Sequence, residues 1–528
     1  MKKLILCIVS TGILACGSPS ADGGKDLPKR GGTLVYAKNS PPVTMDPALT
    51  TDTESTTPCD NVYDPLVQLR LGSAGLTPGL AKTWEISSDG LIYTFHLRTG
   101  VMFHDGTPFN ADAVLFAMER QRDINHPHPH QNDAFAFWQN FSMDRLIRQI
   151  RAMNDSTVEF ELQNPNATFL YLLSMQFTSI PSPTAVRRWG KEFGRHPVGT
   201  GPFVFTRWTS DDVLVLAANE KYWDGRPFLD TLVFTAVPNA DDRINRFLAG
   251  AYDMIESPPE HRISELEANR SIKLLRQPGV NVAYLAMNLN KRPYNDERVR
   301  RAVVYAINRE ALVENVYGQL GSPAKNPIPP TMIGYNEEIQ PLPYDPSKAR
   351  ELLKEAGFPN GFKTSLWTMN IAREYLPDPK KAADLIREDL HEVGISADVK
   401  IYDWHDYIER TNEGEHDLAI RGWIADIPDP DNFFYPLLDK AVADQIPSNN
   451  IAFYRGEEMH ELLMKGKTET NLFQRDLIYK EACSVFNRDL PWFLIAHSVV
   501  VIPMKESVMD FQPYASYSRR FNTVWFSK

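Results

Sequence analysis

Apolar and polar residues between positions 365 and 423 alternate in a way that predicts strands and helices in turn. Short apolar runs typical of buried strands cover Ser365–Met369, Ala397–Tyr402 and Leu418–Trp423. Between them, Lys380–Val393 repeats apolar residues at helical spacing, and His405–Asn412 predicts a shorter helix. The order strand, helix, strand, helix, strand predicts a parallel sheet with helices on its faces.

The same patterns extend to both sides of this unit. Asp345 is placed to cap a helix that begins at Pro346 and ends at Gly357. Ile92–Leu97 alternates apolar and polar residues, which predicts an antiparallel strand with one exposed face. A further amphipathic helix is predicted from the spacing of Val299, Val303, Ile307 and Leu312. The chain therefore belongs to the α/β class.

Two residues of opposite charge follow strands of the predicted parallel sheet. Arg373 follows the strand that ends at Met369, and Asp426 follows the strand that ends at Trp423. Ligands of open α/β sheets bind beyond the carboxyl ends of such strands. A free short peptide is a zwitterion, whose ammonium needs a carboxylate and whose carboxylate suits a guanidinium. Trp423 and Trp404 are candidate aromatic walls for such a ligand, with packing in the core as the alternative.

Blocks of sequence along most of the chain carry a family resemblance. The run Gly422–Phe434 contains Gly-Trp-x-x-Asp-x-x-Asp-Pro-Asp-Asn-Phe. It resembles the solute-binding proteins of bacterial peptide ABC importers (extracellular solute-binding protein family 5), most of all the dipeptide-binding branch. Further similar blocks are Gly31–Ala37, Gly79–Val114, Val198–Phe205, Asn219–Phe234, Tyr284–Glu310, Ala324–Asn336 and Tyr344–Phe358.

The resemblance assigns roles to two of the candidate residues. In the dipeptide-binding branch, the first Asp of the run holds a peptide's amino group, and that residue is Asp426 here. Arg373 falls where the branch has the Arg that binds the peptide's carboxylate. Asp429 and Asp431 are interpreted as residues that shape the loop. The implied protein captures a di- or short peptide and delivers it to a permease complex in the inner membrane. No cofactor and no enzymatic activity are implied, and a monomer is expected.

The resemblance also implies an architecture. It is a two-lobed periplasmic-binding-protein fold of the class II type, with an additional inserted α+β domain and a ligand cleft that closes by a two-stranded hinge. Lobe I is expected to comprise residues 31–76, 198–288 and 498–528. The inserted domain is expected at 77–197 and lobe II at 289–497.

Other cargoes and other classes of protein remain alternatives. Within the family, the cargo alternatives are glutathione, haem, longer antimicrobial peptides or a nickel chelate. The alternatives from other classes of protein are a secreted hydrolase and an adhesin that uses the same scaffold. The enzyme motifs are incomplete, since His460-Glu461 is followed by Met464 where a zinc helix needs His. Gly466-Lys467-Thr468 lacks the earlier Gly of a phosphate loop, and no Gly-x-Ser-x-Gly occurs.

The N-terminus has the pattern of an export signal. A basic start and a short apolar run at 4–14 lead into Ile13-Leu14-Ala15-Cys16, which resembles a lipobox. We therefore expect a lipoprotein signal peptide at 1–15, acylation of Cys16 and a flexible tether at 16–32. The alternative is a plain secretory peptide cleaved near Ala15 or Ala21. The expected location is periplasmic or at the cell surface, anchored to a membrane by the lipid.

Charge and metal-binding residues narrow the partners. The net charge of −11 disfavours nucleic acid as a partner. The three Asp of the acidic loop lack the spacing of a calcium loop. The run His126, His128 and His130 is a weaker candidate for a transition metal, and a solvated loop is favoured. Cys59 and Cys483 are predicted to be buried free thiols, although an exported protein permits a disulfide.

Overall fold

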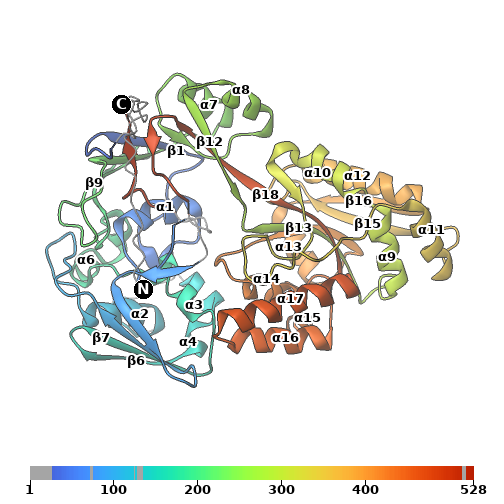
Figure 1. Ribbon diagram of the computed structural model, residues 1–528, viewed down its shortest axis with the longest axis horizontal. Coiled ribbons are helices and arrows are strands. Elements are labelled where there is room, and N and C mark those ends of the chain that lie inside the picture. The colour runs from blue at the N-terminus through green and yellow to red at the C-terminus, as the bar shows by residue number, and fades with distance from the viewer. Residues whose placement is uncertain (1–26, 72–74, 124, 128–134, 514–518, 528) are drawn as a thin grey trace, which may run out of the picture.

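The computed structural model describes residues 27–71, 75–123, 125–127, 135–513 and 519–527. Two lobes lie side by side and are joined by long strands (Figure 1). A twelve-stranded sheet passes through both lobes. Its order is β16 (Ile395–Tyr402), β15 (Phe362–Met369), β17 (Leu418–Ile424), β13 (Asn281–Met287), β18 (Trp492–Lys505), β11 (Met254–Ile255), β1 (Thr33–Lys38), β10 (Thr231–Ala236), β9 (Val213–Ala218) and β8 (Phe203–Trp208), with β12 (Ile272–Pro278) and β14 (Gly321–Pro323) paired to β18.

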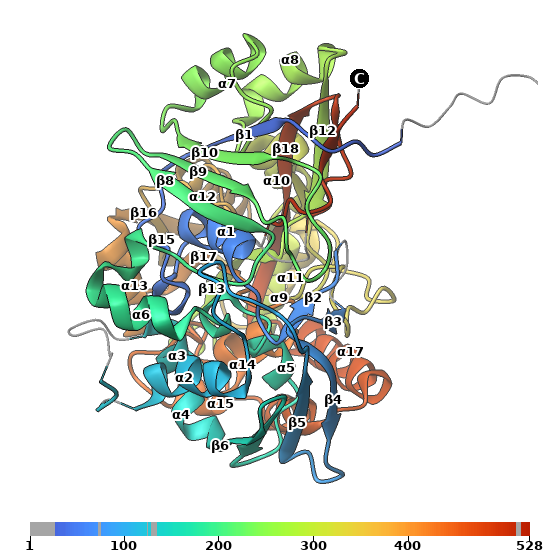
Figure 2. The same ribbon diagram turned by 90° about the vertical axis from the view of Figure 1, so that its left-hand side faces the viewer.

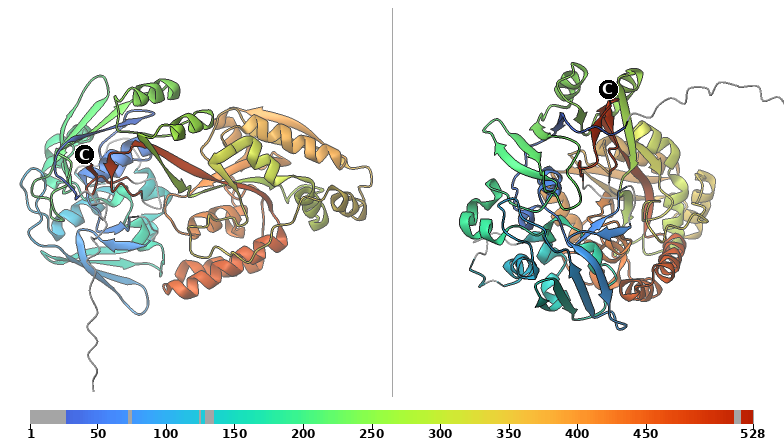
Figure 3. Two further views of the ribbon diagram at one scale, coloured as in Figure 1. Left: turned by 45° about the horizontal axis from the view of Figure 1, so that its top comes forward. Right: turned by 60° about the vertical axis from the view of Figure 1, so that its left-hand side comes forward.

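The connection between the lobes is made by β18 and by the junction of β12 and β13. The first part of β18 pairs with β13, and the part from Val499 onward pairs with β12. Between these parts, the Gly279 amide donates to the carbonyl of Ser498 at 2.8 Å. The chain therefore crosses between lobes near residues 279–281 and 498. Figure 3 shows β18 as the long red strand that runs from one lobe to the other. The predicted crossing at 288/289 lies too late, because β13 is already paired with β17 of the second lobe.

The strand–helix–strand unit predicted from the sequence is confirmed in the second lobe. β15 pairs in parallel with both β16 and β17. α12 (Pro379–Glu392) and α13 (Trp404–Asn412) connect these strands. The apolar stripe of α12 is fully buried at Ala383, Ile386 and Leu390. The core of this lobe draws its buried residues from positions 280–496 alone.

A separate antiparallel sheet occupies the lower part of the first lobe (Figure 2). Tyr93, Phe95 and Leu97 are buried in its second strand, as the alternation predicted. The boundary predicted between lobe I and the inserted domain, at 76/77, falls inside the hairpin of β2 (Val67–Leu69) and β3 (Leu76–Pro78). Leu66, Val67 and Leu69, on the lobe I side of that boundary, pack into the core of the antiparallel sheet. The sheet has the order β4 (Ala81–Ile86), β5 (Ile92–Leu97), β7 (Thr157–Leu162) and β6 (Ile147–Asn154).

The single helix predicted over 299–312 is wrong, because two helices form there. α9 (Glu297–Ala306) ends where Ile307 adopts an extended conformation. α10 (Arg309–Tyr317) then begins anew, with the Asn308 side chain accepting a hydrogen bond from the Ala311 amide at 3.1 Å. The apolar spacing continues across the break, so periodicity alone did not reveal the cap. By contrast, α11 (Pro346–Glu355) starts at its predicted cap, Asp345.

The remaining helices cover the faces of the sheets. Cys59 in α1 and Cys483 in α17 are buried free thiols, as predicted. Within the described ranges, no helix combines the length and apolar composition that crossing a bilayer requires. These other helices are α1 (Thr53–Val62), α2 (Ala111–Arg122), α3 (Ala136–Asn140), α4 (Met143–Leu146), α5 (Phe169–Leu172), α6 (Pro183–Trp189), α7 (Ala240–Leu248), α8 (Ile263–Ala268), α14 (Asp431–Leu438), α15 (Lys440–Ala443), α16 (Glu457–Thr468) and α17 (Leu472–Asp489).

Candidate ligand-binding cleft

A cavity of about 1370 Å³ lies between the two lobes. One wall comes from the first lobe, including the start of α1 and the short helical turns η2 (Gln176–Thr178) and η4 (Glu260–Arg262). The other wall comes from the loops after β15 and β17. Those loops stand at the carboxyl ends of adjacent parallel strands, where such sheets present groups to ligands. The cavity is therefore the candidate ligand site.

Asp426 lies on this wall, two residues after β17 ends. The side-chain oxygen of Asn432 accepts hydrogen bonds from the Asp426 amide at 3.1 Å and from the Trp423 indole at 3.3 Å. This shared acceptor fixes the loop. The carboxylate is reached by solvent through the cavity, yet the surrounding protein removes enough water to raise the pKa of Asp426 to about 6. A fixed, partly desolvated carboxylate suits a cationic group of a ligand.

Arg373 lies on the same wall, in the loop after β15. A tight turn holds its backbone, since Arg373 and Leu376 exchange backbone hydrogen bonds at 3.0 and 2.9 Å. Its guanidinium lies 4.3 Å from the ring centre of Trp404. That stacking limits the orientations that the guanidinium can adopt. The two charged residues that the sequence suggested thus line one cavity, and the ring of Trp404 stacks against the guanidinium of Arg373.

The two tryptophans take other positions than the predicted ligand wall. Neither Trp423 nor Trp404 is among the residues that line the cavity. Both are partly buried and pack against the core of the second lobe. Trp404 supports Arg373, and Trp423 binds Asn432 of the acidic loop. Cys16, the predicted lipid attachment site, lies outside the described residues.

Asp429 was predicted to shape its own loop, and it also connects that loop to a distant helix. Its carboxylate forms a two-pronged ion pair with Arg475 of α17, and both side chains are almost wholly buried. Asp431 is held by hydrogen bonding to Tyr479, and burial together with the charge of Asp429 raises the pKa of Asp431 to about 6. Neither lines the cavity. Asp429 therefore joins the acidic loop to α17.

The acidic loop also contacts the first lobe. Ile427, next to Asp426, is buried in the core formed by residues 48–180, although it comes from the other lobe. Nearby, the Ala167 amide donates a hydrogen bond to the carbonyl of Lys467 at 2.9 Å, which joins the lobes a second time. The loop that carries the candidate anchor is thus in contact with both lobes.

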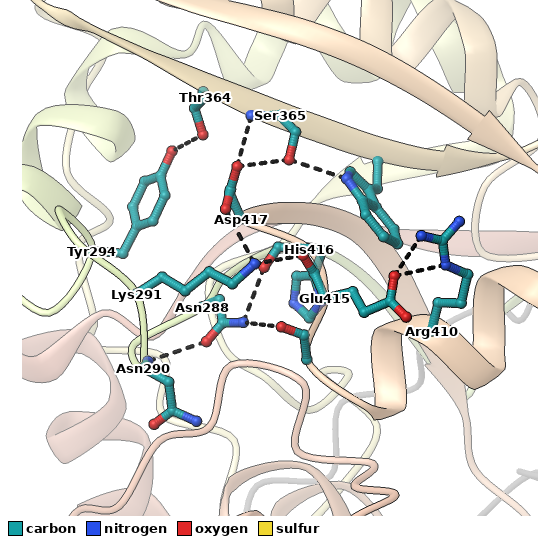
Figure 4. A network of polar contacts seen from close by, with 12 residues as sticks. Asn288, Asn290, Lys291, Tyr294, Thr364, Ser365, Arg410, Glu415, His416 and Asp417 are labelled. Atoms are coloured by element: carbon teal, nitrogen blue, oxygen red, sulfur yellow. Dashed lines mark hydrogen bonds and ion pairs between the residues drawn. The ribbon is translucent and has the colours of Figure 1, made fainter.

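A polar network at the opposite ends of these strands sets their register (Figure 4). The Asp417 carboxylate, just before β17, accepts hydrogen bonds from the Ser365 amide at 3.0 Å and from the Ser365 hydroxyl at 2.7 Å. Lys291 donates to the other oxygen of Asp417 at 3.3 Å. Because β15 and β17 are tied at this end, the loops that bear Arg373 and Asp426 emerge in a fixed relation.

The metal alternatives find little support in the arrangement of the side chains. The oxygens of Asp429 are committed to Arg475, so the three Asp do not form a calcium loop. His126 packs edge-on against the ring of Phe116. His128 and His130 lie outside the described residues. Among the described residues, no group of three His, Cys, Asp or Glu is placed to hold a metal ion.

The cavity also contains acidic residues that the sequence did not single out. Asp52 is the residue that caps α1, Glu54 lies in the first turn of that helix, and Glu260 comes from η4. In the chain, Asp52 and Glu54 lie 374 and 372 residues before Asp426, and Glu260 lies 166 residues before it, so no local pattern connects them. Only the packing of the two lobes brings these carboxylates to one cavity.

Comparison with known proteins places this cleft in a protein family. The chain belongs to the bacterial extracellular solute-binding proteins, family 5, whose model matches residues 75–445. Its α/β architecture is that of the periplasmic binding proteins.

Individual relatives are named for two kinds of cargo. The chain is 38% identical to heme-binding protein A of Haemophilus influenzae, over 97% of this chain and 96% of that protein. It is 36% identical to the dipeptide-binding protein of Escherichia coli, over 91% and 92% of the two chains. The periplasmic binding protein DppA of Helicobacter pylori, solved with the peptide STSA, superposes with a TM-score of 0.77 at 36% identity, covering 95% of this chain and 99% of that one.

Proposed function

We propose that this protein is the peptide receptor of an ABC importer and binds a short peptide by both of its ends. Asp426 accepts the peptide's ammonium, and Arg373 accepts its carboxylate. The observation that carries this proposal is the presence of both residues on one cavity wall, at the ends of adjacent parallel strands. The names of the Escherichia coli and Helicobacter pylori relatives support a peptide as the cargo. The loaded receptor then delivers its cargo to a separate permease complex.

A dipeptide library tested by thermal shift and calorimetry examines this proposal. A ligand present at a hundredfold excess over its Kd stabilises the fold by about 2.7 kcal/mol, so binders should raise the melting temperature clearly. Haem is the second candidate, favoured by the name of the Haemophilus influenzae relative. If haem shifts the melting curve and no peptide does, the peptide proposal is wrong.

Replacing Arg373 should affect only peptides with a free carboxylate. In Arg373→Ala, a free dipeptide loses its charge partner and should bind roughly tenfold to a hundredfold more weakly. The C-amidated dipeptide carries no such charge, so its affinity should change less. Calorimetry with the matched acid and amide measures the difference. Equal losses for both ligands would contradict the assignment of Arg373 to the carboxylate.

Peptide binding should weaken in mild acid. The pKa of Asp426 is raised to about 6, so the carboxylate is charged above that pH and becomes neutral below it. The affinity for a free dipeptide should therefore be highest near about pH 7, where the carboxylate is charged and the peptide's amino group, with a pKa of about 8, is still protonated. It should fall toward tenfold per pH unit well below about pH 6. In Asp426→Asn, this dependence should disappear. An affinity in the wild type that is unchanged between about pH 7 and pH 5 would rule out Asp426 as the titrating anchor.

The attachment to a membrane is part of the proposal and rests on Cys16. If Cys16 carries the lipid, Cys16→Ala should move the protein from the membrane fraction to the soluble fraction, since an acyl anchor supplies the membrane affinity. Cell fractionation with immunodetection measures this, with Cys59→Ala as a control at a buried thiol. Membrane association of Cys16→Ala equal to that of the wild type would exclude this anchor.

A further inference from the structure

The lining of the cavity is strongly acidic. Three guanidiniums, those of Arg243, Arg373 and Arg520, oppose seven carboxylates, which gives a formal charge of −4 with histidine neutral. A cleft with charges of one sign and protein walls concentrates the field of those charges on any ligand inside it. The carboxylates are those of Asp52, Glu54, Asp60, Glu260, Glu374, Asp378 and Asp426.

Two of the three guanidiniums are already engaged by the protein. Arg520 forms a buried ion pair with Asp64, which is outside the lining. Arg243 is buried and donates to three backbone carbonyls, among them that of Val237 at 2.6 Å. Arg373 has no ion-pair partner among the described residues and stacks on Trp404. A bound peptide therefore meets one available cation in this cavity.

Several carboxylates, by contrast, have no cation beside them. Asp52, Glu54 and Glu260 of the first lobe form no ion pair within the described parts of the chain. Asp52 caps α1 by accepting from the Ser55 amide at 2.7 Å, and the helix terminus offsets only about half a unit charge. After Asp426 and Arg373 neutralise the two ends of a peptide, these three carboxylates still face the cavity without a counter-ion.

A second observation shows that this first-lobe wall lacks a polar partner. Gln176 of η2 lines the cavity with only 8% of its surface exposed, and its Nε2 has no hydrogen-bond partner among the described residues. A buried amide group without a partner is costly, and a peptide carbonyl is an acceptor that would satisfy it. The wall that carries Asp52 and Glu54 thus also holds a buried donor that has no partner among the described residues.

We propose that this cavity selects cationic peptides, in which a lysine or arginine side chain faces the carboxylates of Asp52, Glu54 and Glu260. This inference rests on the proposed peptide-binding function and adds a preference for side-chain charge. An acidic side chain in the same place meets like charges and is disfavoured.

Calorimetry with three dipeptides of similar length tests the preference. Ala-Ala, Ala-Lys and Ala-Glu all have free termini and differ in the charge of one side chain. We expect Ala-Lys to bind at least about tenfold more tightly than Ala-Glu at low salt, with a smaller ratio at about 0.5 M salt because of screening. Lys-Ala and Glu-Ala should be measured in parallel, because either the first or the second side chain of the dipeptide could face the three carboxylates.

A charge-matched pair of variants assigns the preference to the first-lobe carboxylates. D52N/E54Q/E260Q removes three charges from the lining, and Asn at position 52 can still cap α1. E337Q/E413Q/E461Q removes three exposed carboxylates outside the cavity, so its net charge equals that of the first variant. We expect the Lys-to-Glu affinity ratio to fall at least about threefold in the first variant and to be unchanged in the second. The affinity for Ala-Ala and the melting temperature report whether each variant is folded.

The outcomes separate this inference from the proposed function. If Ala-Ala binds but the charge of the side chain makes no difference, or Glu is preferred, the cationic preference is wrong and the receptor function stands. An equal fall of the ratio in both triple variants would also overturn it, because the effect would then come from net charge alone. If no dipeptide binds to the wild type, the proposed function fails and the preference fails with it.

Discussion

Asp426→Asn should weaken the binding of a free dipeptide by roughly 30-fold to several thousandfold. The substitution keeps the shape of the side chain and removes its charge, so the ligand's ammonium enters the cleft without a counter-ion. Loss of one partner of a desolvated charge pair typically costs about 2–5 kcal/mol. Isothermal calorimetry at about pH 7.5, where the wild-type carboxylate is charged, measures the loss.

Asp431→Asn, at the start of α14 directly after the same loop, is the matched control. Asp431 is one residue beyond Pro430 and does not line the cavity, so its substitution should change affinity much less. An N-acetylated dipeptide provides a second control, because it has no ammonium for Asp426 to bind. If Asp426→Asn binds the free dipeptide as tightly as the wild type, Asp426 does not hold the amino group.

Asp429→Asn should lower the free energy of unfolding by about 3–5 kcal/mol. The substitution leaves the guanidinium of Arg475 buried without its counter-ion, and breaking one side of a buried pair has a cost of that size. Denaturation in urea, followed by tryptophan fluorescence, measures the change. This differs from the expectation from sequence, in which Asp429 only shaped its loop.

Glu297→Gln serves as the control for that stability change. Glu297 pairs with Arg301 one turn along α9, and the pair is exposed enough that its loss should cost about 0.5 kcal/mol or less. A loss for Asp429→Asn as small as that of Glu297→Gln would mean that the buried ion pair contributes little to the stability of this protein.

The part of the cleft that could be predicted from the sequence is the part built from regularly spaced apolar residues. Alternation and helical spacing placed β15, β16 and β17 in parallel, and the ends of two of these strands then brought Arg373 and Asp426 to one wall. Such predictions succeed because the orientation of a strand follows from the strand and helix that precede it. The family resemblance added the roles of the two residues, and those roles remain predictions.

Contacts between distant segments explain what the sequence could not predict. Arg475 lies 46 residues after Asp429, and nothing local indicates that the two side chains pair. Trp404 was a candidate wall for the ligand, with packing in the core as the alternative. It packs against the core of the second lobe and stacks against Arg373, a contact that no local pattern indicates. At Ile307 the apolar pattern continued through a helix break, since the capping bond of Asn308 outweighed it.

The burial of Ile427 in the first lobe affects how easily the two lobes separate. To move apart, the lobes must withdraw this side chain from the first-lobe core and separate Ala167 from Lys467. Exposing one aliphatic side chain costs about 1.5–3 kcal/mol, and one hydrogen bond contributes about 1 kcal/mol. A cost of a few kcal/mol corresponds to a minor population of roughly 0.1–10%, reached by thermal motion. Once its cargo has left, each molecule can therefore reopen without an energy source of its own.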